Sequence, residues 1–254
     1  MALIKTEKEI ERMREGGKRL AHVLYALRDA VKPGITGKEL DKMAEKMILA
    51  GGDALAFKNY QPRGADFPFP ATLCVSVNDV IVHGIPNGEP FKEGDIVGLD
   101  LGLAHGGLFV DMAVTVAVGK ISDADRELID TTEKALNVGI AQVRADVRMG
   151  EIGSAIEAVA RPHGYGIVRE LGGHGVGHEV HEEPYIPNFG KPNTGPVLRA
   201  GMVLALEPMF NLGTGEISNG KDNFSYRTLD GKKSAHFEKT IVVTKEGSGI
   251  LTEI

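Results

Sequence analysis

Apolar residues recur at helical spacing through the first fifty positions of the chain. They form two stripes, first Ile10, Met13, Leu20, Val23, Leu24, Leu27 and Val31, then Leu40, Met43, Ala44, Met47 and Ile48. Thr6 and Glu9 fit a capping box, in which each side chain satisfies an amide left open at a helix start. The same spacing recurs at Thr36 and Glu39, and glycine-containing pairs at 33–34 and 51–52 follow each stripe. The pattern predicts two helices.

The second half of the chain repeats this order. Helical spacing returns from about Asp123 to Val143 and, more briefly, over 151–157, closed near Pro162 and Gly164. Strand-like apolar runs follow each predicted helix pair, at 95–101 and 108–116, then at 202–207 and 237–243. We therefore expect two similar halves of two helices and antiparallel strands, about 4–118 and 119–254. We expect them to pack as one domain spanning 1–254.

Two aspartates interrupt the strand-like runs of the first half. Asp100 and Asp111 each lie among aliphatic residues, and the chain can make a hairpin around His105-Gly106. An even loop length would place the two aspartates in direct register, about 4.5–5.5 Å apart between Cβ atoms. Two carboxylates that close in an apolar ribbon repel one another and lose hydration. A shared proton, an arginine or a metal ion has to compensate.

The second half carries the same oddity at Glu207 and Glu238. Each acid taken alone could equally lie on the solvent-exposed face of a strand. His174, flanked by glycines, could be an ordinary loop residue. Taken together in matched halves, the four acids and His174 predict a common cation site. An oxygen-rich set with one imidazole suits two divalent ions such as Mn, Fe, Co or Zn. Two such ions about 3.5–4 Å apart are typical of metal-assisted hydrolysis.

The composition and charge of the chain indicate which kinds of partner and which cell compartment to expect. The 254 residues carry a formal net charge of −6 with no basic block, which argues against nucleic acid or an anionic membrane as the main partner. Cys74 is the one cysteine, so no internal disulfide or cysteine-based zinc site is expected. The N-terminus lacks the apolar run of a signal peptide, and no apolar stretch approaches the length of a membrane span. We expect a cytoplasmic protein.

Several ordered motifs resemble one known family. They are Ile4-Lys5-Thr6, Val31-Lys32-Pro33-Gly34, Ser76-Val77-Asn78-Asp79, His83-Gly84-Ile85-Pro86, Gly173-His174-Gly175-Val176-Gly177, His181-Glu182-Glu183-Pro184, Leu206-Glu207-Pro208-Met209 and Ser234-Ala235-His236-Phe237-Glu238. From about residue 4 to the C-terminus the sequence resembles the type I methionine aminopeptidases, in their bacterial form. The resemblance implies an α+β pita-bread fold, in which two pseudo-symmetric halves surround a dinuclear metal site.

The resemblance also implies a role for each site residue. The implied metal ligands are Asp100, Asp111, His174, Glu207 and Glu238. Of these, Asp111 and Glu238 would bridge two ions (Co, Mn, Fe or Zn), and Glu207 would also help to take a proton. His181 would contact the scissile peptide and His83 the leaving amide, while a metal-bridging hydroxide attacks the first peptide carbonyl. The implied substrates are the N-termini of nascent polypeptides with a small second residue, met at the ribosome by a monomeric enzyme.

The sequence departs from this family mainly around the side-chain pocket. Val180 stands where an aromatic residue is frequent, Phe224 where a tryptophan is common, and the 60–70 segment is altered and lengthened. Elsewhere, Gly102 stands where a threonine is usual. We expect the pocket wall to be formed by Phe67, Phe69, Cys74 and Phe224, for which plain core packing is the alternative.

Four further histidines are expected outside the site. His105, His163 and His236 are interpreted as surface or packing residues, and His22 as structural. Two other functions stay open: a prolidase or aminopeptidase P-like peptidase of the same fold, and a non-catalytic binding homologue.

Overall fold

Four helices form two pairs in the computed structural model, which describes residues 4–61 and 66–254. They are α1 (Glu7–Ala30), α2 (Gly37–Ala50), α3 (Asp123–Gln142) and α4 (Met149–Ala160), and a 3₁₀ turn, η1 (Arg161–His163), follows the last. Both predicted capping boxes, at Thr6 and Thr36, are present. Within the described ranges, none of the helices has the length and apolar character that a membrane crossing requires.

The strands form one large sheet and two small ones. Their bounds are β1 (Ala54–Leu55), β2 (Leu73–Val77), β3 (Val80–Val82), β4 (Ile96–His105), β5 (Leu108–Ala117), β6 (Gly166–Ile167), β7 (Gly172–Gly175), β8 (Glu182–Pro187), β9 (Val203–Leu206), β10 (Met209–Asn211), β11 (Ile217–Asn219), β12 (Tyr226–Thr228), β13 (Ser234–His236), β14 (Glu238–Val243) and β15 (Ser248–Ile250). The nine-stranded sheet runs β1-β4-β5-β14-β9-β7-β8, with β2 on β4 and β15 on β14. The small sheets are β13-β10-β6 and β11-β12-β3.

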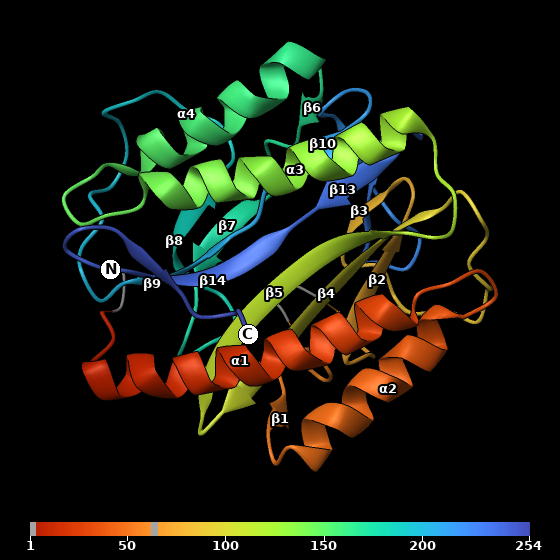
Figure 1. Ribbon diagram of the computed structural model, residues 1–254, viewed down its shortest axis with the longest axis horizontal. Helices are drawn as coiled ribbons and strands as arrows, with labels where there is room; N and C mark the ends of the chain where they lie inside the picture. Colours follow the sequence, from red (N-terminus) through yellow and green to blue (C-terminus); the bar gives the residue numbers. More distant parts are fainter. Residues whose placement is uncertain (1–3, 62–65) are drawn as a thin grey trace.

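The two helix pairs lie along the two halves of the large sheet. In Figure 1, α1 (red) lies along β4 and β5 with α2 (orange) beside it, whereas α3 and α4 (green) lie along the strands of the second half. The long strands β5 and β14 run between the pairs and hydrogen-bond to each other, so they form a seam that joins the halves. The predicted arrangement of two helix–helix–strand halves is confirmed.

Alternation along the strands decides which side chains face the helices. Val110 on β5 lies under α1, since its Cγ2 is 3.6 Å from the position that a Cβ on Gly16 would take. On β14, the Lys239 ammonium donates a hydrogen bond to the Tyr25 hydroxyl of α1 at 3.1 Å. Successive residues on a strand point to opposite faces. Asp111 and Glu238, each one residue away, therefore point to the face turned away from α1.

The β4–β5 hairpin corrects one prediction. Its two-residue turn is Gly106-Gly107, one position later than expected, so Asp100 pairs with Ala113 and Asp111 pairs with Gly102. The aspartates are therefore diagonal neighbours on one face, and the predicted direct register is wrong. Both turn glycines have positive φ values (55° and 82°), a backbone conformation that glycine adopts without strain, which fixes the turn at this place.

We expect Gly17→Ala to lower the free energy of unfolding by about 1–3 kcal/mol, the usual range for overpacking. A Cβ at Gly17 on α1 would overlap the carbonyl oxygen of Leu251, whose side chain is fully buried. Urea unfolding measures the change. Gly247→Ala is the matched control, because nothing lies within 4 Å of a Cβ there. Equal unfolding midpoints for the two variants would contradict this packing argument.

Candidate metal centre

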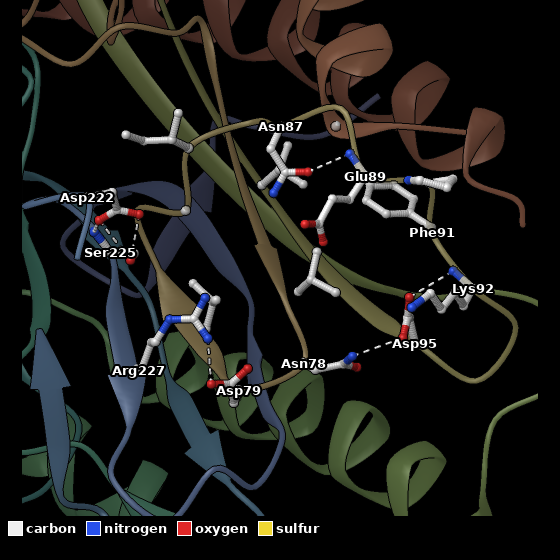
Figure 2. Close-up of a pocket in the computed structure, with 17 residues that line it drawn as sticks. Asn78, Asp79, Asn87, Glu89, Phe91, Lys92, Asp95, Asp222, Ser225 and Arg227 are labelled. Carbon is white, nitrogen blue, oxygen red and sulfur yellow. Dashed lines mark hydrogen bonds and ion pairs between the residues drawn. The ribbon is translucent and has the colours of Figure 1, made fainter. Parts of the chain in front are cut away.

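A cavity of about 280 Å³ lies beside the turn between β2 and β3 (Figure 2). Two of its charged groups form an ion pair, Arg227 with Asp79 at 2.6 Å, and the Asn78 amide donates a hydrogen bond to Asp95 at 2.9 Å. Among the described residues, the buried side-chain polar atoms without a hydrogen-bond partner all lie elsewhere. Among its described lining residues, this cavity therefore shows no buried, unpaired polar side chain that would mark a ligand or ion site.

Unpaired donors lie instead on the sheet face turned away from α1. Residues paired across neighbouring strands place Cys74 beside Asp100, Asp100 beside Ala113, and Ala113 beside Glu238. Asp111 lies two residues before Ala113 on the same strand, so it shares this face. Three carboxylates from β4, β5 and β14 thus surround one small side chain, that of Ala113, and can meet above it.

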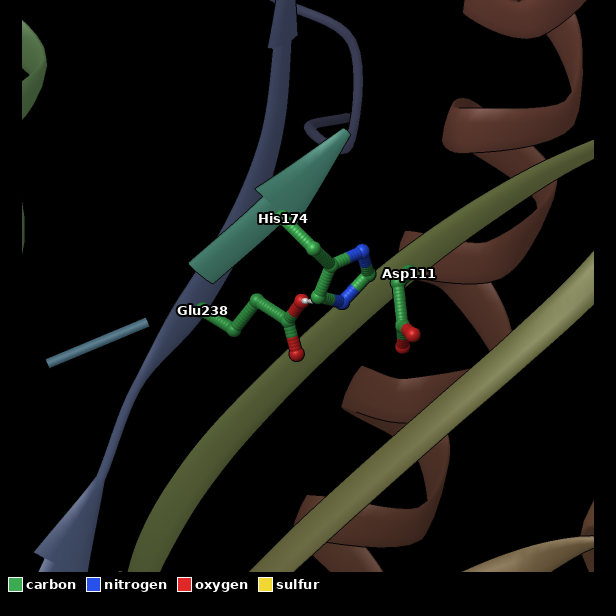
Figure 3. Close-up of side chains that lie close together, drawn as sticks. All are labelled: Asp111, His174 and Glu238. Carbon is green, nitrogen blue, oxygen red and sulfur yellow. Dashed lines mark ion pairs between the residues drawn. The ribbon is translucent and has the colours of Figure 1, made fainter. Parts of the chain in front are cut away.

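The second half adds an imidazole and a fourth carboxylate. His174 lies on β7, and its Nε2 is 3.6 Å from Glu207 Oε1 and 3.9 Å from Glu238 Oε1. One ligand atom each from Asp111, His174 and Glu238 lies within 4.8 Å of the others, and Figure 3 shows the three side chains converging from their strands. The glycines beside His174 are required, since a Cβ on Gly173 or Gly175 would overlap a carbonyl oxygen of β9 or β8.

Burial perturbs every ionisable group of this cluster. It raises the pKa values of Glu207, Asp100 and Glu238 well above normal, the last two further because of the neighbouring carboxylates. Burial, followed by the charge of Glu207, raises the pKa of Asp111 to about 7. Burial also lowers the pKa of His174 to about 3. Without a counter-charge the cluster stabilises neutral acids and a neutral imidazole, so it favours a cation between them.

The donor set fits a divalent ion. Asp100 Oδ1 and Glu238 Oε1 are buried oxygens without a hydrogen-bond partner, and an unpaired buried oxygen is costly. Of the described side chains that line the cavity above the cluster, none is lysine or arginine. Carboxylate oxygens with one imidazole nitrogen suit borderline divalent metals. The residues present therefore fit the divalent-metal site that the sequence predicts.

A cavity of about 70 Å³ leads to the cluster. It is lined by Phe57, Tyr60, Phe69, Cys74, His83, Asp100, Asp111, His174, His181, Glu207, Phe224 and Glu238. The structure thus brings His83 and His181 together with all five predicted metal ligands. Burial lowers the pKa of His83 to about 4 and also lowers that of His181, so both rings are neutral near pH 7. His83 has a φ of 60°, a strained conformation of the kind that clusters at functional sites.

The apolar wall differs in part from the prediction. Phe69, Cys74 and Phe224 line the cavity, whereas Phe67 is 42% exposed and only contacts the Phe224 ring from outside, at 5.3 Å between centroids. Phe57 and Tyr60 line the cavity although they were not predicted there. Residues 62–65 of the altered segment lie outside the described residues.

Two interactions explain how Phe57 and Tyr60 enter the site. A Cβ at Gly102 would lie 2.8 Å from Phe57 Cε1, so the glycine in place of the usual threonine makes room for this ring. The Tyr60 hydroxyl lies 3.0 Å from His181 Nδ1 and so fixes the orientation of that imidazole. The altered segment that begins at Tyr60 and the glycine at position 102 could be recognised in the sequence, but their contacts with His181 and Phe57 could not.

His236 is a site residue that the sequence analysis assigned to the surface or the packing. It is buried, and its Nε2 lies 3.4 Å from Glu207 Oε2. Burial lowers the pKa of His236 to about 3, so the ring is neutral. The sequence did contain one sign of this role, because His236 stands two residues before the predicted ligand Glu238. His163 pairs with Glu127 at 3.1 Å, and His105 pairs with Asp53 at 2.7 Å, both away from the site.

Comparisons with known proteins agree with this architecture. The sequence model of metallopeptidase family M24 matches residues 11–245. The chain is 42% identical to methionine aminopeptidase of Clostridium perfringens and to methionine aminopeptidase 1 of Bacillus subtilis, covering 100% of both chains in each comparison. A crystal structure of methionine aminopeptidase from Rickettsia prowazekii superposes with a TM-score of 0.95 at 38% identity, again over 100% of both chains. The chain therefore belongs to metallopeptidase family M24 and has its pita-bread fold, within the methionine aminopeptidase branch.

Proposed function

We propose that this protein is a metal-dependent aminopeptidase that hydrolyses the first peptide bond of nascent proteins and releases methionine when the second residue is small. The observation that supports this most is the convergence of Asp111, His174 and Glu238 within 4.8 Å at the end of a small cavity. The names of the full-length relatives point to the same substrate, whereas a prolidase-like activity is not favoured.

We assign the ligands to two divalent ions, Co, Mn, Fe or Zn. Asp111 and Glu238 would contact both ions, Asp100 one of them, and His174 with Glu207 the other. When bound, such ions polarise a carbonyl group and make water a stronger acid. These five side chains would hold the ions where the cavity meets the cluster.

The remaining residues orient the peptide and move protons. A neutral His181 that accepts a hydrogen bond at Nδ1 from Tyr60 carries its proton on Nε2, ready to donate to the scissile peptide. His83, also neutral, lies where it can position the leaving amide. Glu207 can accept a proton on its carboxylate during bond cleavage. The apolar wall of Phe57, Phe69 and Phe224 would receive the methionine side chain.

The function is tested with two peptides. Metal-loaded protein is given Met-Ala-Ser and an Ala-Pro tripeptide, alongside an Asp111→Ala variant that lacks one cluster carboxylate. Release of methionine from the first peptide alone, absent in the variant, supports the proposal. Cleavage of the proline peptide would favour the prolidase-like activity, and cleavage of neither would favour a binding homologue.

We expect Tyr60→Phe to lower kcat/KM for Met-Ala-Ser about fivefold, the value of one neutral hydrogen bond of about 1 kcal/mol. The substitution removes only the hydroxyl that orients His181 and keeps the ring in the cavity wall. Steady-state kinetics measures the effect, with Tyr185→Phe as control, because that hydroxyl donates to the Arg169 carbonyl outside the cavity. Unchanged kinetics in Tyr60→Phe would show that this hydrogen bond does not orient the histidine.

We further infer that residues 1–254 act as one catalytic domain, because the nine-stranded sheet continues through both halves. All the proposed ligands come from this one chain, which supports action as a monomer. The proposed substrates are made at the ribosome in the cytoplasm, so we place the protein there. Light scattering that gave the mass of a dimer would contradict the monomer.

A further inference from the structure

His181 lies in a loop, residues 176–181, that connects β7 to β8 and also carries Val180. One end of this loop is held to the first half of the sheet, because the Gly177 carbonyl accepts a hydrogen bond from the Phe109 amide at 2.7 Å. The other end is held by Glu182. Its Oε1 accepts hydrogen bonds from the amides of His178 at 2.5 Å and Glu179 at 3.1 Å. A single carboxylate therefore closes the loop on itself.

The second oxygen of the Glu182 carboxylate forms an ion pair with a lysine near the N-terminus. Lys5 Nζ lies 2.5 Å from Glu182 Oε2, and the two side chains are 0% and 5% exposed. The backbone amide of Lys5 donates to the Gly201 carbonyl at 2.8 Å, which fixes the lysine just before α1. A buried ion pair of this kind is sensitive to the loss of either partner, because the remaining charge stays buried and uncompensated.

The loop is built to admit this lysine. Gly177 has a φ of 147°, and a Cβ at that position would overlap Lys5 Cε. A second contact joins the same two segments, since His178 Nε2 lies 2.8 Å from Glu9 Oε1 on α1. The N-terminal segment and the His181 loop, about 175 residues apart in the chain, therefore meet through one buried and one exposed polar contact.

We propose that Lys5 and Glu182 are positioning residues that hold the His181 loop in the geometry needed for turnover. This inference rests on the proposed function, because it assigns His181 a contact with the scissile peptide. Neither Lys5 nor Glu182 lines the cavity, so both act through the loop. Loss of the Lys5 charge should then impair turnover while the ligand cluster keeps its affinity for metal.

The test compares Lys5→Met with Lys233→Met. Lys233 forms a less buried ion pair with Asp125, at 2.8 Å, in the second half of the protein. For Met-Ala-Ser we expect kcat of Lys5→Met to fall at least about tenfold with KM within about twofold, the pattern of an interaction made in the transition state. Mn²⁺ affinity, measured by calorimetry, should stay at the wild-type value, and Lys233→Met should keep wild-type kinetics.

A double variant separates positioning from general destabilisation. In Lys5→Met/Glu182→Gln no lone buried charge remains, and the Gln Oε1 still accepts the two loop amides. We expect it to recover part of the lost kcat, a coupling that independent sites would not show. Methionine release by the wild type with equal kcat in Lys5→Met overturns this inference alone. A wild type that releases no methionine overturns the proposed function and this inference with it.

Discussion

Glu238→Ala is expected to lower kcat for methionine release at least about a thousandfold, or about 4 kcal/mol in activation free energy. Glu238 is the carboxylate from β14 that lies 3.9 Å from His174 and faces Asp100 across Ala113, so its loss opens the centre of the donor set. Calorimetry should show weaker binding of both Mn²⁺ ions, since the proposed bridging ligand is gone. Normal turnover in this variant would contradict the proposed coordination.

A milder substitution at the same position has a second expected effect. Glu238→Gln removes an acid whose ionised form is destabilised by burial and then by the neighbouring carboxylates, so the metal-free variant should melt at a higher temperature than the metal-free wild type. Added Mn²⁺ should raise the melting temperature of the wild type, because a ligand that binds only the folded state stabilises it, but should do so less for the variant. Glu133→Gln, exposed on α3, serves as control and should behave like the wild type.

His181→Ala is expected to lower kcat/KM for Met-Ala-Ser about a hundredfold or more, the usual contribution of a positioned proton donor. The proposed donor atom is Nε2, since Nδ1 is engaged by Tyr60 at 3.0 Å. Mn²⁺ affinity should change little, because the His181 ring contacts His174 but is not one of the proposed ligands. Stopped assays with varied peptide concentration give kcat and KM separately.

The matched control for this prediction is His163→Ala. His163 is a histidine on the 3₁₀ turn η1 that pairs with Glu127 and lies outside the cavity. It should leave kcat/KM at the wild-type value. A His181→Ala variant that differs from His163→Ala only in Mn²⁺ affinity would show that the ring serves the metal cluster rather than the peptide.

Features that depend on neighbouring residues in the chain could be predicted from the sequence. The helix starts at Thr6 and Thr36 follow from capping boxes that lie within four residues, and both form as predicted. Acids in or directly after aliphatic strands, such as Asp100 on β4 and Glu207 after β9, also marked a special site, because an unpaired buried carboxylate needs a compensating charge. The ligand roles of the individual acids stay predictions.

Features that depend on three-dimensional partners could not be predicted. A shift of one residue in the Gly106-Gly107 turn changed the pairing of Asp100 from Asp111 to Ala113, and the local sequence allows either turn. The space that Gly102 leaves for Phe57 appears only when β1 and its neighbouring segment lie on β4. His236 reaches Glu207 because β10 and β13 pair, which a strand pattern alone does not reveal.

The β5–β14 seam has a consequence for how the protein assembles. Asp111 lies on one side of this junction and Glu238 on the other, so neither half of the chain holds a complete donor set. A divalent ion bound by both residues would stabilise the contact between the two halves. Fragments 1–118 and 119–254, mixed as separate chains, should therefore associate more tightly with Mn²⁺ than with a chelator.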